Sequence, residues 1–227
     1  RKEAFNKRTL FFPRYHQLDV VRQLIADTEE QGVGQTYLIQ HSAGSGKSNS
    51  ITWAAYQLIE TYPKTADIPG AKNIGSPLFD SVIVVTDRRL LDKQLRDNIR
   101  DFSEVKNIVA PAMSSADLNK HLENGKRIII TTIQKFPFIV DGLADLSDKR
   151  FAVVIDEAHS SQSGSAAGTM NQAMGMGDIE ETEDPQLLIL QAMEARKMRD
   201  NASYLAFTAT PKNTTLERFG VKQADGT

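Results

Sequence analysis

Five short apolar runs rich in β-branched residues recur along the chain and alternate with segments that have helical periodicity. The runs span residues 36–40, 81–86, 127–132, 151–155 and 203–207. Each is apolar at successive positions, which is typical of strands covered on both faces. Segments 48–61, 89–102, 116–124 and 186–200 carry apolar residues at three- and four-residue spacing, as helices do, and a lead-in helix is predicted around 17–30. The alternation predicts an α/β fold, an open, mainly parallel sheet with helices on both faces.

Composition limits the classes of protein to which the chain can belong. Its 227 residues are 40% hydrophobic and 25% charged, enough for one large α/β domain with a proper core. No apolar run approaches the roughly 20 residues that span a bilayer, and the absence of cysteine excludes disulfides and thiolate metal sites. We therefore expect a cytoplasmic protein without a membrane partner. A net charge of −2 means that DNA binding would need a local cluster of basic residues. The start at Arg1, without an initiator Met, suggests a piece of a longer protein.

Two stretches interrupt the alternation. Residues 62–80 contain three prolines and two glycines, and residues 160–185 are rich in serine, glycine, methionine and acidic residues. Both are predicted to be long surface loops. Loops of this length in a compact domain are usually functional or mobile, although a tether without a role remains an alternative.

The sequence HSAGSGKS, residues 41–48, has the ending of a phosphate-binding loop but carries His41 where the G-x-x-x-x-G-K-[ST] form has its first glycine. A phosphate loop needs glycines that let backbone N–H groups turn toward the phosphates, a helix N-terminus and a lysine. Gly44, Gly46 and Lys47 supply these features, and Ser48 would place its hydroxyl on Mg²⁺. The alternative is a turn of small residues that caps a helix.

A second candidate site follows the run 151–155, where Asp156 and Glu157 are adjacent. Parallel strands deliver the residues at their carboxyl ends to the crevice where ligands bind. Asp156 would bind Mg²⁺, and Glu157 would orient and deprotonate an attacking water. The alternative is an acidic turn that closes a strand. Together with the phosphate loop, the two acids favour a nucleotide hydrolase.

The order of these motifs resembles that of superfamily 2 helicases and translocases. AGSGKS (43–48), VVIDEAH (153–159) and FTATP (207–211) are similar to motifs I, II and III. RYHQ (14–17) resembles the upstream adenine-reading element, VTDRRLLDKQL (85–95) motif Ia, and TTIQKF (131–136) motif Ib. The wording around them, above all VIDEAHSSQSG, resembles the motor subunit of type I restriction-modification enzymes over essentially the whole chain.

The resemblance implies a RecA-like P-loop NTPase fold and a division of the chain. Residues 1–35 would form a lead-in with the adenine-reading element, 36–220 the first helicase lobe, and 221–227 a linker toward a second lobe. Motors of this superfamily hydrolyse ATP between two lobes, and the second contributes arginines. We therefore expect this chain alone to hydrolyse ATP poorly, because the charge on the transferred phosphoryl group lacks its cationic partner.

The resemblance also implies roles for single residues, with ATP and Mg²⁺ as the cofactors. Gln17 would hold adenine through its amide, and the phosphates would be bound by Ala43, Gly44, Ser45, Gly46, Lys47 and Ser48. Lys47, Asp156 and Glu157 would be catalytic, with Ser48 and Asp156 as Mg²⁺ ligands. His159, Thr208, Ala209 and Thr210 would couple the nucleotide site to DNA. Arg88, Thr131 and Thr132 would contact DNA phosphates, although an ordinary helix start and simple strand propensity are alternatives. His16 and His121 are interpreted as structural or exposed.

The leading hypothesis is the ATP-driven motor lobe of a type I restriction endonuclease subunit, which moves double-stranded DNA. Its partners would be methyltransferase and specificity subunits. One alternative is another superfamily 2 motor, such as a type III restriction subunit or a repair helicase. A second alternative is a nucleotide-regulated binding module without turnover. A GTPase is disfavoured, because residues 119–122 (NKHL) lack the aspartate of the N-K-x-D guanine element.

Overall fold

The computed structural model of the chain describes residues 12–42, 44–86, 108–133, 135–146, 148–156, 189, 191, 193 and 201–209. The predicted helix 89–102 and the predicted loop 160–185 lie outside this set. Of the predicted helix 186–200, only residues 189, 191 and 193 are described, and all three are helical.

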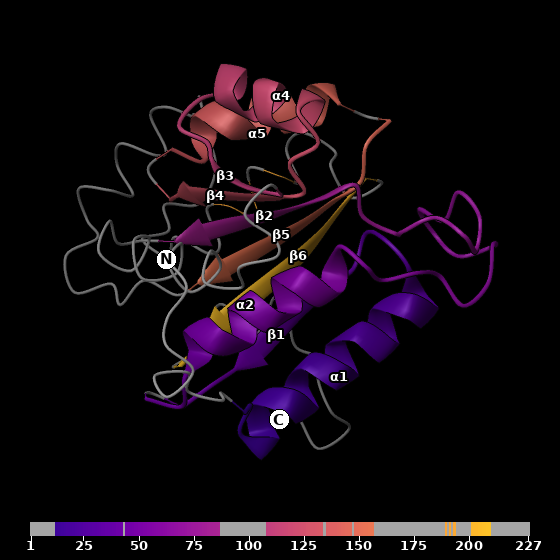
Figure 1. Cartoon of the computed structure of the whole chain (residues 1–227), viewed down its shortest axis with the longest axis vertical. Coiled ribbons are helices and arrows are strands. Elements are labelled where there is room, and N and C mark those ends of the chain that lie inside the picture. The colour runs from indigo at the N-terminus through magenta and orange to yellow at the C-terminus, as the bar shows by residue number, and fades with distance from the viewer. Residues whose placement is uncertain are drawn as a thin grey trace, which may run out of the picture.

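A parallel sheet runs through the described part of the chain, with its strands in the order β1-β6-β5-β2-β4-β3 (Figure 1). The strands are β1 (Thr36–Gln40), β2 (Ser81–Thr86), β3 (Val109–Pro111), β4 (Ile128–Thr132), β5 (Phe151–Asp156) and β6 (Ala202–Thr208). Every pair of neighbours is parallel. The predicted open α/β sheet is confirmed, and five of its strands are the five predicted runs to within a residue or two.

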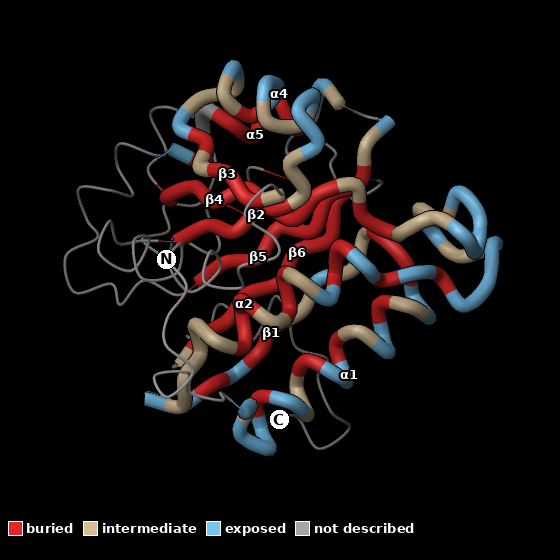
Figure 2. The backbone as a smooth tube through the Cα atoms, viewed as in Figure 1, coloured by how far each residue is buried: buried red, intermediate tan, exposed pale blue. Residues whose placement is uncertain are grey.

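The inner strands are covered on both faces, as their continuous apolar runs predict. Every residue of β2, β4, β5 and β6 is buried, whereas β1 at the edge of the sheet is only partly buried (Figure 2). The burial of alternate side chains on opposite faces divides the interior into two apolar clusters.

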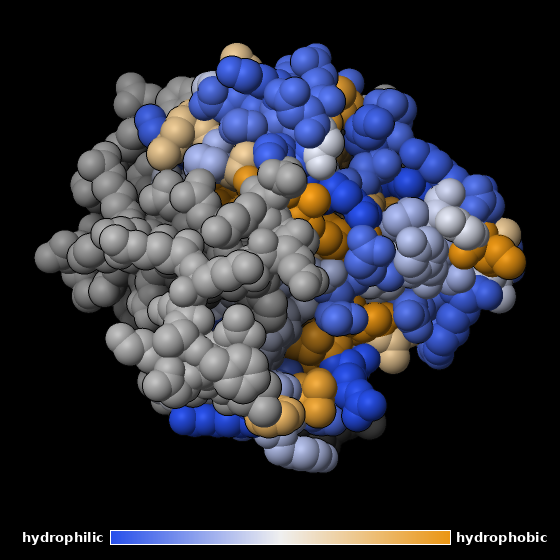
Figure 3. Space-filling view, viewed as in Figure 1, coloured by the Kyte–Doolittle hydropathy of each residue, from blue (hydrophilic) through white to orange (hydrophobic). Residues whose placement is uncertain are grey.

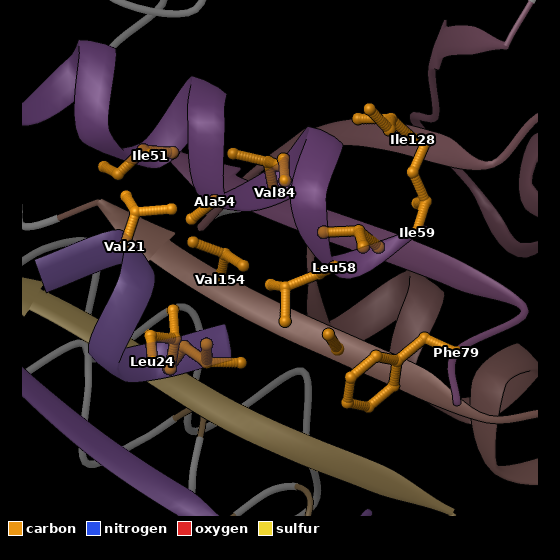
Figure 4. Close-up of a cluster of buried hydrophobic side chains, with 14 of the residues drawn as sticks. Val21, Leu24, Ile51, Ala54, Leu58, Ile59, Phe79, Val84, Ile128 and Val154 are labelled. Carbon is orange, nitrogen blue, oxygen red and sulfur yellow. The ribbon is translucent and has the colours of Figure 1, made fainter. Parts of the chain in front are cut away.

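Helices cover the two faces of the sheet. The helices α1 (Tyr15–Gln31) and α2 (Lys47–Leu58) contribute Val21, Leu24, Ile51 and Leu58 to the cluster that includes Val84 and Val154 (Figure 4). The helix α4 (Ser115–Glu123) contributes Leu118 to the other cluster, and α5 (Pro137–Asp145) contributes Ile139, Val140 and Leu143. In Figure 3 polar side chains cover much of the described surface in that view, and apolar ones show only in small groups.

Three details differ from the sequence-based expectation. Helix α2 ends at Leu58, before the predicted end at Thr61. Strand β3 was not predicted, because it has three residues, one of them a proline, and pairs only at the sheet edge. Helix α5 was not predicted either, because it is short and contains Gly142. The division at residues 35 and 220 stays a prediction.

The predicted loop 62–80 contains no helix or strand, as expected, but it is tied to the rest of the molecule. Asp80 makes several of the contacts that connect the loop to the rest of the molecule. Its carboxylate accepts hydrogen bonds from the backbone N–H of Arg150 at 2.9 Å and from Arg150 Nε at 3.2 Å, and the Arg150 guanidinium also donates to the carbonyl of Gly70. Burial raises the pKa of Asp80, but the hydrogen bonds and charge of Arg150 and the charge of Lys72 outweigh it and lower the pKa. These bonds anchor the loop to Arg150, the residue before β5.

The helices of the described part of the chain include none with the length and apolar character of a membrane span.

Candidate nucleotide site

The carboxyl ends of the parallel strands bring the predicted motifs to one edge of the sheet. Gln40, at the end of β1, is paired in register with Thr208 of β6. Asp156, the last residue of β5, is paired with Phe207 of β6. The phosphate-loop sequence begins directly after β1, so the first and second motifs lie on either side of β6. This is the place where open α/β sheets bind ligands.

The loop between β1 and α2 has the backbone that a phosphate loop requires. Gly44 and Gly46 have φ angles of 75° and 84°, in the left-handed region. Gly46 is the N-cap of α2, so the free backbone N–H groups of the first helical turn begin at Lys47. Among the described residues, and apart from its chain neighbours, no atom lies within 4 Å of a Cβ built on Gly44. The loop is therefore open beside Gly44 and is followed by a helix N-terminus, which favours an anion.

Helix α1 contacts this loop through the side chains of Gln17 and His16. Gln17 is buried, and its Nε2 donates to the carbonyl oxygens of Ser45 at 2.9 Å and Gly46 at 3.1 Å. Its Oε1 accepts from the backbone N–H of Arg14 at 2.8 Å, as the third residue of a helix does in a capping box. His16 Nε2 also lies 3.1 Å from the Ser45 carbonyl. The amide of Gln17 thus has protein partners on both its atoms, and its predicted contact with adenine stays a prediction.

Gln17 also lines a cavity of about 620 Å³ between α1 and α2. Leu18, Val21 and Trp53 are among its mainly apolar neighbours in that cavity. A cavity of this size and lining is typical of small-molecule sites.

The first and second motifs are joined by an ion pair. Lys47 Nζ lies 3.2 Å from Asp156 Oδ1, and the aspartate side chain is only 4% exposed. The even-numbered residues of β5 face α2, as Ala152 and Val154 show, so the carboxylate of Asp156 is directed to the start of that helix. The prediction that Asp156 and the phosphate loop serve the same site is consistent with this geometry.

His41, at the position of the absent glycine, is a buried residue of the site. Its ring stacks on Phe207, with centroids 6.1 Å apart, and meets the ring of His16 edge-on at 5.8 Å. Its Nδ1 lies 3.0 Å from Ser45 Oγ. Burial, followed by the positive charges of His16 and Lys47, lowers the pKa of His41. The contact itself could not be predicted, because it depends on how α1 and β6 pack against the loop.

The third motif lies next to the first. The backbone N–H of His41 donates to the carbonyl of Thr208 at 2.7 Å, which extends the pairing of β1 with β6 into the phosphate loop. Thr208 is buried, and Ala209 follows it at the strand end. A hydrogen bond of this kind would transmit a shift of the loop to motif III. The other two predicted coupling residues, His159 and Thr210, lie outside the described residues, as do Ala43 and Glu157.

The two threonines that are predicted to contact DNA are buried. Thr131 and Thr132 are 2% and 7% exposed at the end of β4. DNA phosphates would reach them only after neighbouring groups move. Arg88 lies outside the described residues. The DNA contacts therefore stay predictions. His121 Nε2 lies 2.9 Å from the carbonyl oxygen of Pro111, to which it can donate a hydrogen bond, and this contact fits its interpretation as structural.

The described residues fit a nucleotide with Mg²⁺. The positive-φ glycines and the start of α2 suit phosphates, Lys47 supplies a cation, and Ser48 and Asp156 would supply two oxygen ligands. The described residues contain no group of three or more His, Cys, Asp or Glu that could hold a metal. Two ligands suffice for Mg²⁺ at a nucleotide, since this ion keeps several waters and binds the phosphates themselves.

Comparisons with known proteins agree with this geometry. A family model for SWI2/SNF2 ATPases matches residues 16–223. The chain is 30% identical over 213 residues to a type I restriction enzyme HindI endonuclease subunit from Haemophilus influenzae, covering 87% of this chain and 17% of that protein. It is 28% identical over 193 residues to a putative type I restriction enzyme MjaIXP endonuclease subunit from Methanocaldococcus jannaschii, covering 81% of this chain and 14% of that protein. The chain thus spans about a sixth of the length of these relatives.

Solved structures with a similar fold include helicases. The UvsW helicase from bacteriophage T4 has a TM-score of 0.52 at 14% identity, over 96% of this chain and 60% of that one. The Hef helicase domain from Pyrococcus furiosus has a TM-score of 0.52 at 17% identity, over 93% and 37%. At these identities the likeness shows the fold, which is the RecA-like fold of helicase domains.

Proposed function

The chain belongs to the SWI2/SNF2 ATPase family, and on that basis we propose that it is the ATP-driven motor lobe of a type I restriction endonuclease subunit that moves along double-stranded DNA. The resemblance to superfamily 2 motors and to type I restriction subunits is confirmed by the family match and by the two relatives. The chain is thus a helicase-like ATPase lobe. Translocation, DNA contact and the subunit partners are the finer part of the proposal.

The contact between Lys47 and Asp156 carries the proposal. A lysine at the start of a helix after one strand and an aspartate at the end of another are 3.2 Å apart at the ligand-binding edge of the sheet. Either residue alone has an ordinary structural explanation. Their meeting beside two positive-φ glycines has the arrangement of a nucleoside triphosphate site.

The chain's own residues would divide the chemistry among them. ATP would supply the phosphoryl group, and Mg²⁺ would neutralise charge on the phosphates. The N–H groups of the loop and of the first turn of α2 would bind the phosphates, and Lys47 would stabilise the charge that develops as the terminal phosphoryl group is transferred. Ser48 and Asp156 would hold the metal. Glu157 would accept the proton of the attacking water.

The DNA side of the proposal rests on the relatives and on the predicted motifs. Both curated relatives are named as type I restriction endonuclease subunits. Motif III would carry changes from the nucleotide to the strand ends through the hydrogen bond between His41 and Thr208. Thr131, Thr132 and Arg88 would contact DNA phosphates, so binding would not depend on sequence. Methyltransferase and specificity subunits would complete the complex and choose the DNA site.

A strand-displacement assay tests the movement on DNA. The intact protein, assembled with its methyltransferase and specificity subunits, is given a linear duplex that carries a third strand far from the recognition site. We expect ATP to cause release of the third strand, and we expect Lys47→Ala to abolish it while DNA binding is kept. Arg127→Lys is the control and should release the third strand normally. Arg127 bonds Glu60 at 2.7 Å and directly precedes β4, at the end of that strand away from Thr131 and Thr132. Hydrolysis of ATP without release of the third strand would refute translocation and leave the ATPase assignment in place.

A further inference from the structure

The phosphate loop is held by a buried side chain from within its own sequence. His41 is 5% exposed, and its Nδ1 lies 3.0 Å from the hydroxyl of Ser45, four residues further along. The imidazole also stacks on Phe207 and meets the ring of His16 edge-on, and both contacts help to keep it in place. Because Ser45 is in the middle of the loop, this contact joins the first residue of the loop to its middle.

The peptide after Ser45 is oriented from outside the loop. The Ser45 carbonyl accepts from Gln17 Nε2 and lies within hydrogen-bond distance of His16 Nε2, so it points toward α1. In a planar trans peptide the N–H points opposite to the carbonyl. The backbone N–H of Gly46 is therefore directed away from α1. The contacts from α1 fix the Ser45 carbonyl, whereas the contact from His41 fixes the Ser45 side chain.

We propose that His41 is a positioning residue of the nucleotide site, which holds Ser45 and thereby keeps the phosphate loop in the conformation that binds the phosphates. This inference rests on the proposed function, because it concerns the same site. His41 would act through Ser45 and not by touching the nucleotide. An open loop without this contact would have to be ordered by the nucleotide itself, at the expense of affinity.

The charges around His41 provide a signature that a purely structural role would lack. His16 faces it from α1 and Lys47 from the start of α2, while β6 presents the uncharged Phe207, and Asp156 on β5 pairs with Lys47. Burial, followed by the electrostatic effects of His16 and Lys47, disfavours the imidazolium form and lowers the pKa of His41. The negative phosphates of a bound nucleotide would favour that form and raise the pKa of His41. Binding should then take up a proton, and affinity should increase as the pH falls from the raised pKa toward the lowered one.

Two substitutions separate the hydrogen bond from the ring. In asparagine the side-chain amide stands where His41 has Nδ1, so His41→Asn can keep a partner for Ser45. In glutamine the amide stands near Nε2, so His41→Gln loses that partner. Titration calorimetry of the intact protein with ADP and Mg²⁺, in two buffers of different ionisation enthalpy near pH 6.5, measures affinity and proton uptake together.

We expect His41→Gln to weaken ADP binding about fivefold, the effect of one hydrogen bond between neutral groups, and His41→Asn to stay within about twofold. The component of proton uptake that depends on His41 should be absent from both variants. Ser45→Ala should weaken binding to the same degree as His41→Gln, and the double variant should be no weaker than either, because both remove one contact. His121→Gln is the matched control and should leave affinity and proton uptake unchanged.

Wild-type affinity and proton uptake in His41→Gln would overturn the inference, as would strictly additive losses in the double variant. Thermal unfolding followed by circular dichroism shows whether a variant is folded. If His41→Gln does not fold, the ADP affinity of Ser45→Ala, which changes a half-buried residue, tests the same contact. If the wild-type protein itself fails to bind ADP, the proposed function is refuted. Normal ADP binding with unaffected variants refutes only the role of His41.

Discussion

Lys47 Nζ and Asp156 Oδ1 lie 3.2 Å apart, although one residue begins a helix and the other ends a strand on the far side of β6. The aspartate is almost fully buried, and a buried carboxylate is stable only with a partner. Lys47 provides that positive charge, and a divalent metal would provide more. The pair thus connects the phosphate loop to the second motif.

Replacing Asp156 tests its role as a metal ligand. Asp156→Asn keeps the shape of the side chain but removes the charge, so Mg²⁺ would be held poorly. We expect the ATP hydrolysis rate of the intact protein to fall by about 100-fold or more, with stability little changed, since metal and phosphate charge stabilisation contributes several kcal/mol to such transition states. Steady-state phosphate release measures the rate.

Asp80→Asn is the matched control for that substitution. Asp80 is also a carboxylate paired with a cation, but it lies at the other end of the sheet, before β2. We expect it to lower stability and to leave the hydrolysis rate per folded molecule unchanged. Equal loss of hydrolysis in both variants would contradict a specific role for Asp156.

Gly46→Ala tests the geometry of the phosphate loop. A Cβ at Gly46 would lie 2.3 Å from Gln17 Nε2, and φ is 84°, so alanine disturbs both the backbone and the contact with α1. We expect nucleotide affinity to fall more than about tenfold and stability to fall by about 1–2 kcal/mol. Binding of a fluorescent ATP analogue and chemical denaturation measure the two effects.

Gly125→Ala provides the comparison. Gly125 also has a positive φ of 71°, but in the described part of the chain no atom beyond its chain neighbours lies within 4 Å of an added Cβ. It follows α4, far from the loop in sequence. A similar loss of stability with normal nucleotide binding is expected. If both variants bind nucleotide normally, the loop does not hold the phosphates.

The two possible roles of Gln17 predict different changes in selectivity for ATP over GTP when this residue is replaced. If the amide only holds the Ser45 and Gly46 carbonyls, Gln17→Ala should weaken ATP and GTP to the same extent. If it also reads adenine, the preference for ATP over GTP should narrow as well. We expect a narrowed preference together with a general loss of about fivefold or more, since two hydrogen bonds to the loop disappear. Competition binding with the two nucleotides distinguishes these outcomes, and an unchanged preference would remove Gln17 from base recognition.

The Asp80–Arg150 contact makes stability depend on pH. The pKa of Asp80 is lower in the folded protein than in the unfolded chain, so its contribution is present above the unfolded pKa and is lost as the pH falls through the folded pKa. We expect Asp80→Asn to cost about 2 kcal/mol at pH 7, the usual range for hydrogen bonds to a charged group, and much less near pH 3. Urea denaturation at both pH values measures the difference. A cost that is the same at both values would show that the charge does not matter.

Much of the fold follows from local pattern. The continuous apolar runs of β2, β4 and β5 predict strands buried on both faces, and this burial is what the structure has. The edge strand β3 and helix α5 could not be predicted in the same way. Three residues are too few to show a period, and β3 is defined by its pairing with β4 rather than by its own residues.

Some residues of the candidate site could likewise be predicted from local sequence, and others could not. Gly46, Lys47 and Asp156 could be predicted because their types and spacing reflect the chemistry of phosphates and metal ions. The contacts of His16 and His41 could not, because they join α1, the loop and β6, which are far apart in the sequence. The absent glycine at position 41 was the available signal. It indicated a departure from one motif form but not the contact that replaces it.

The hydrolysis of ATP by the intact protein, with and without double-stranded DNA, is the most direct test of the proposed function. The measurement is the rate of phosphate release for the wild type and for Lys47→Ala, which removes the cation paired with Asp156 but leaves the fold's core untouched. The account predicts hydrolysis that DNA stimulates in the wild type and that falls by about 100-fold or more in the variant. Equal rates in the two proteins, or a wild type that hydrolyses no ATP with DNA present, would contradict it.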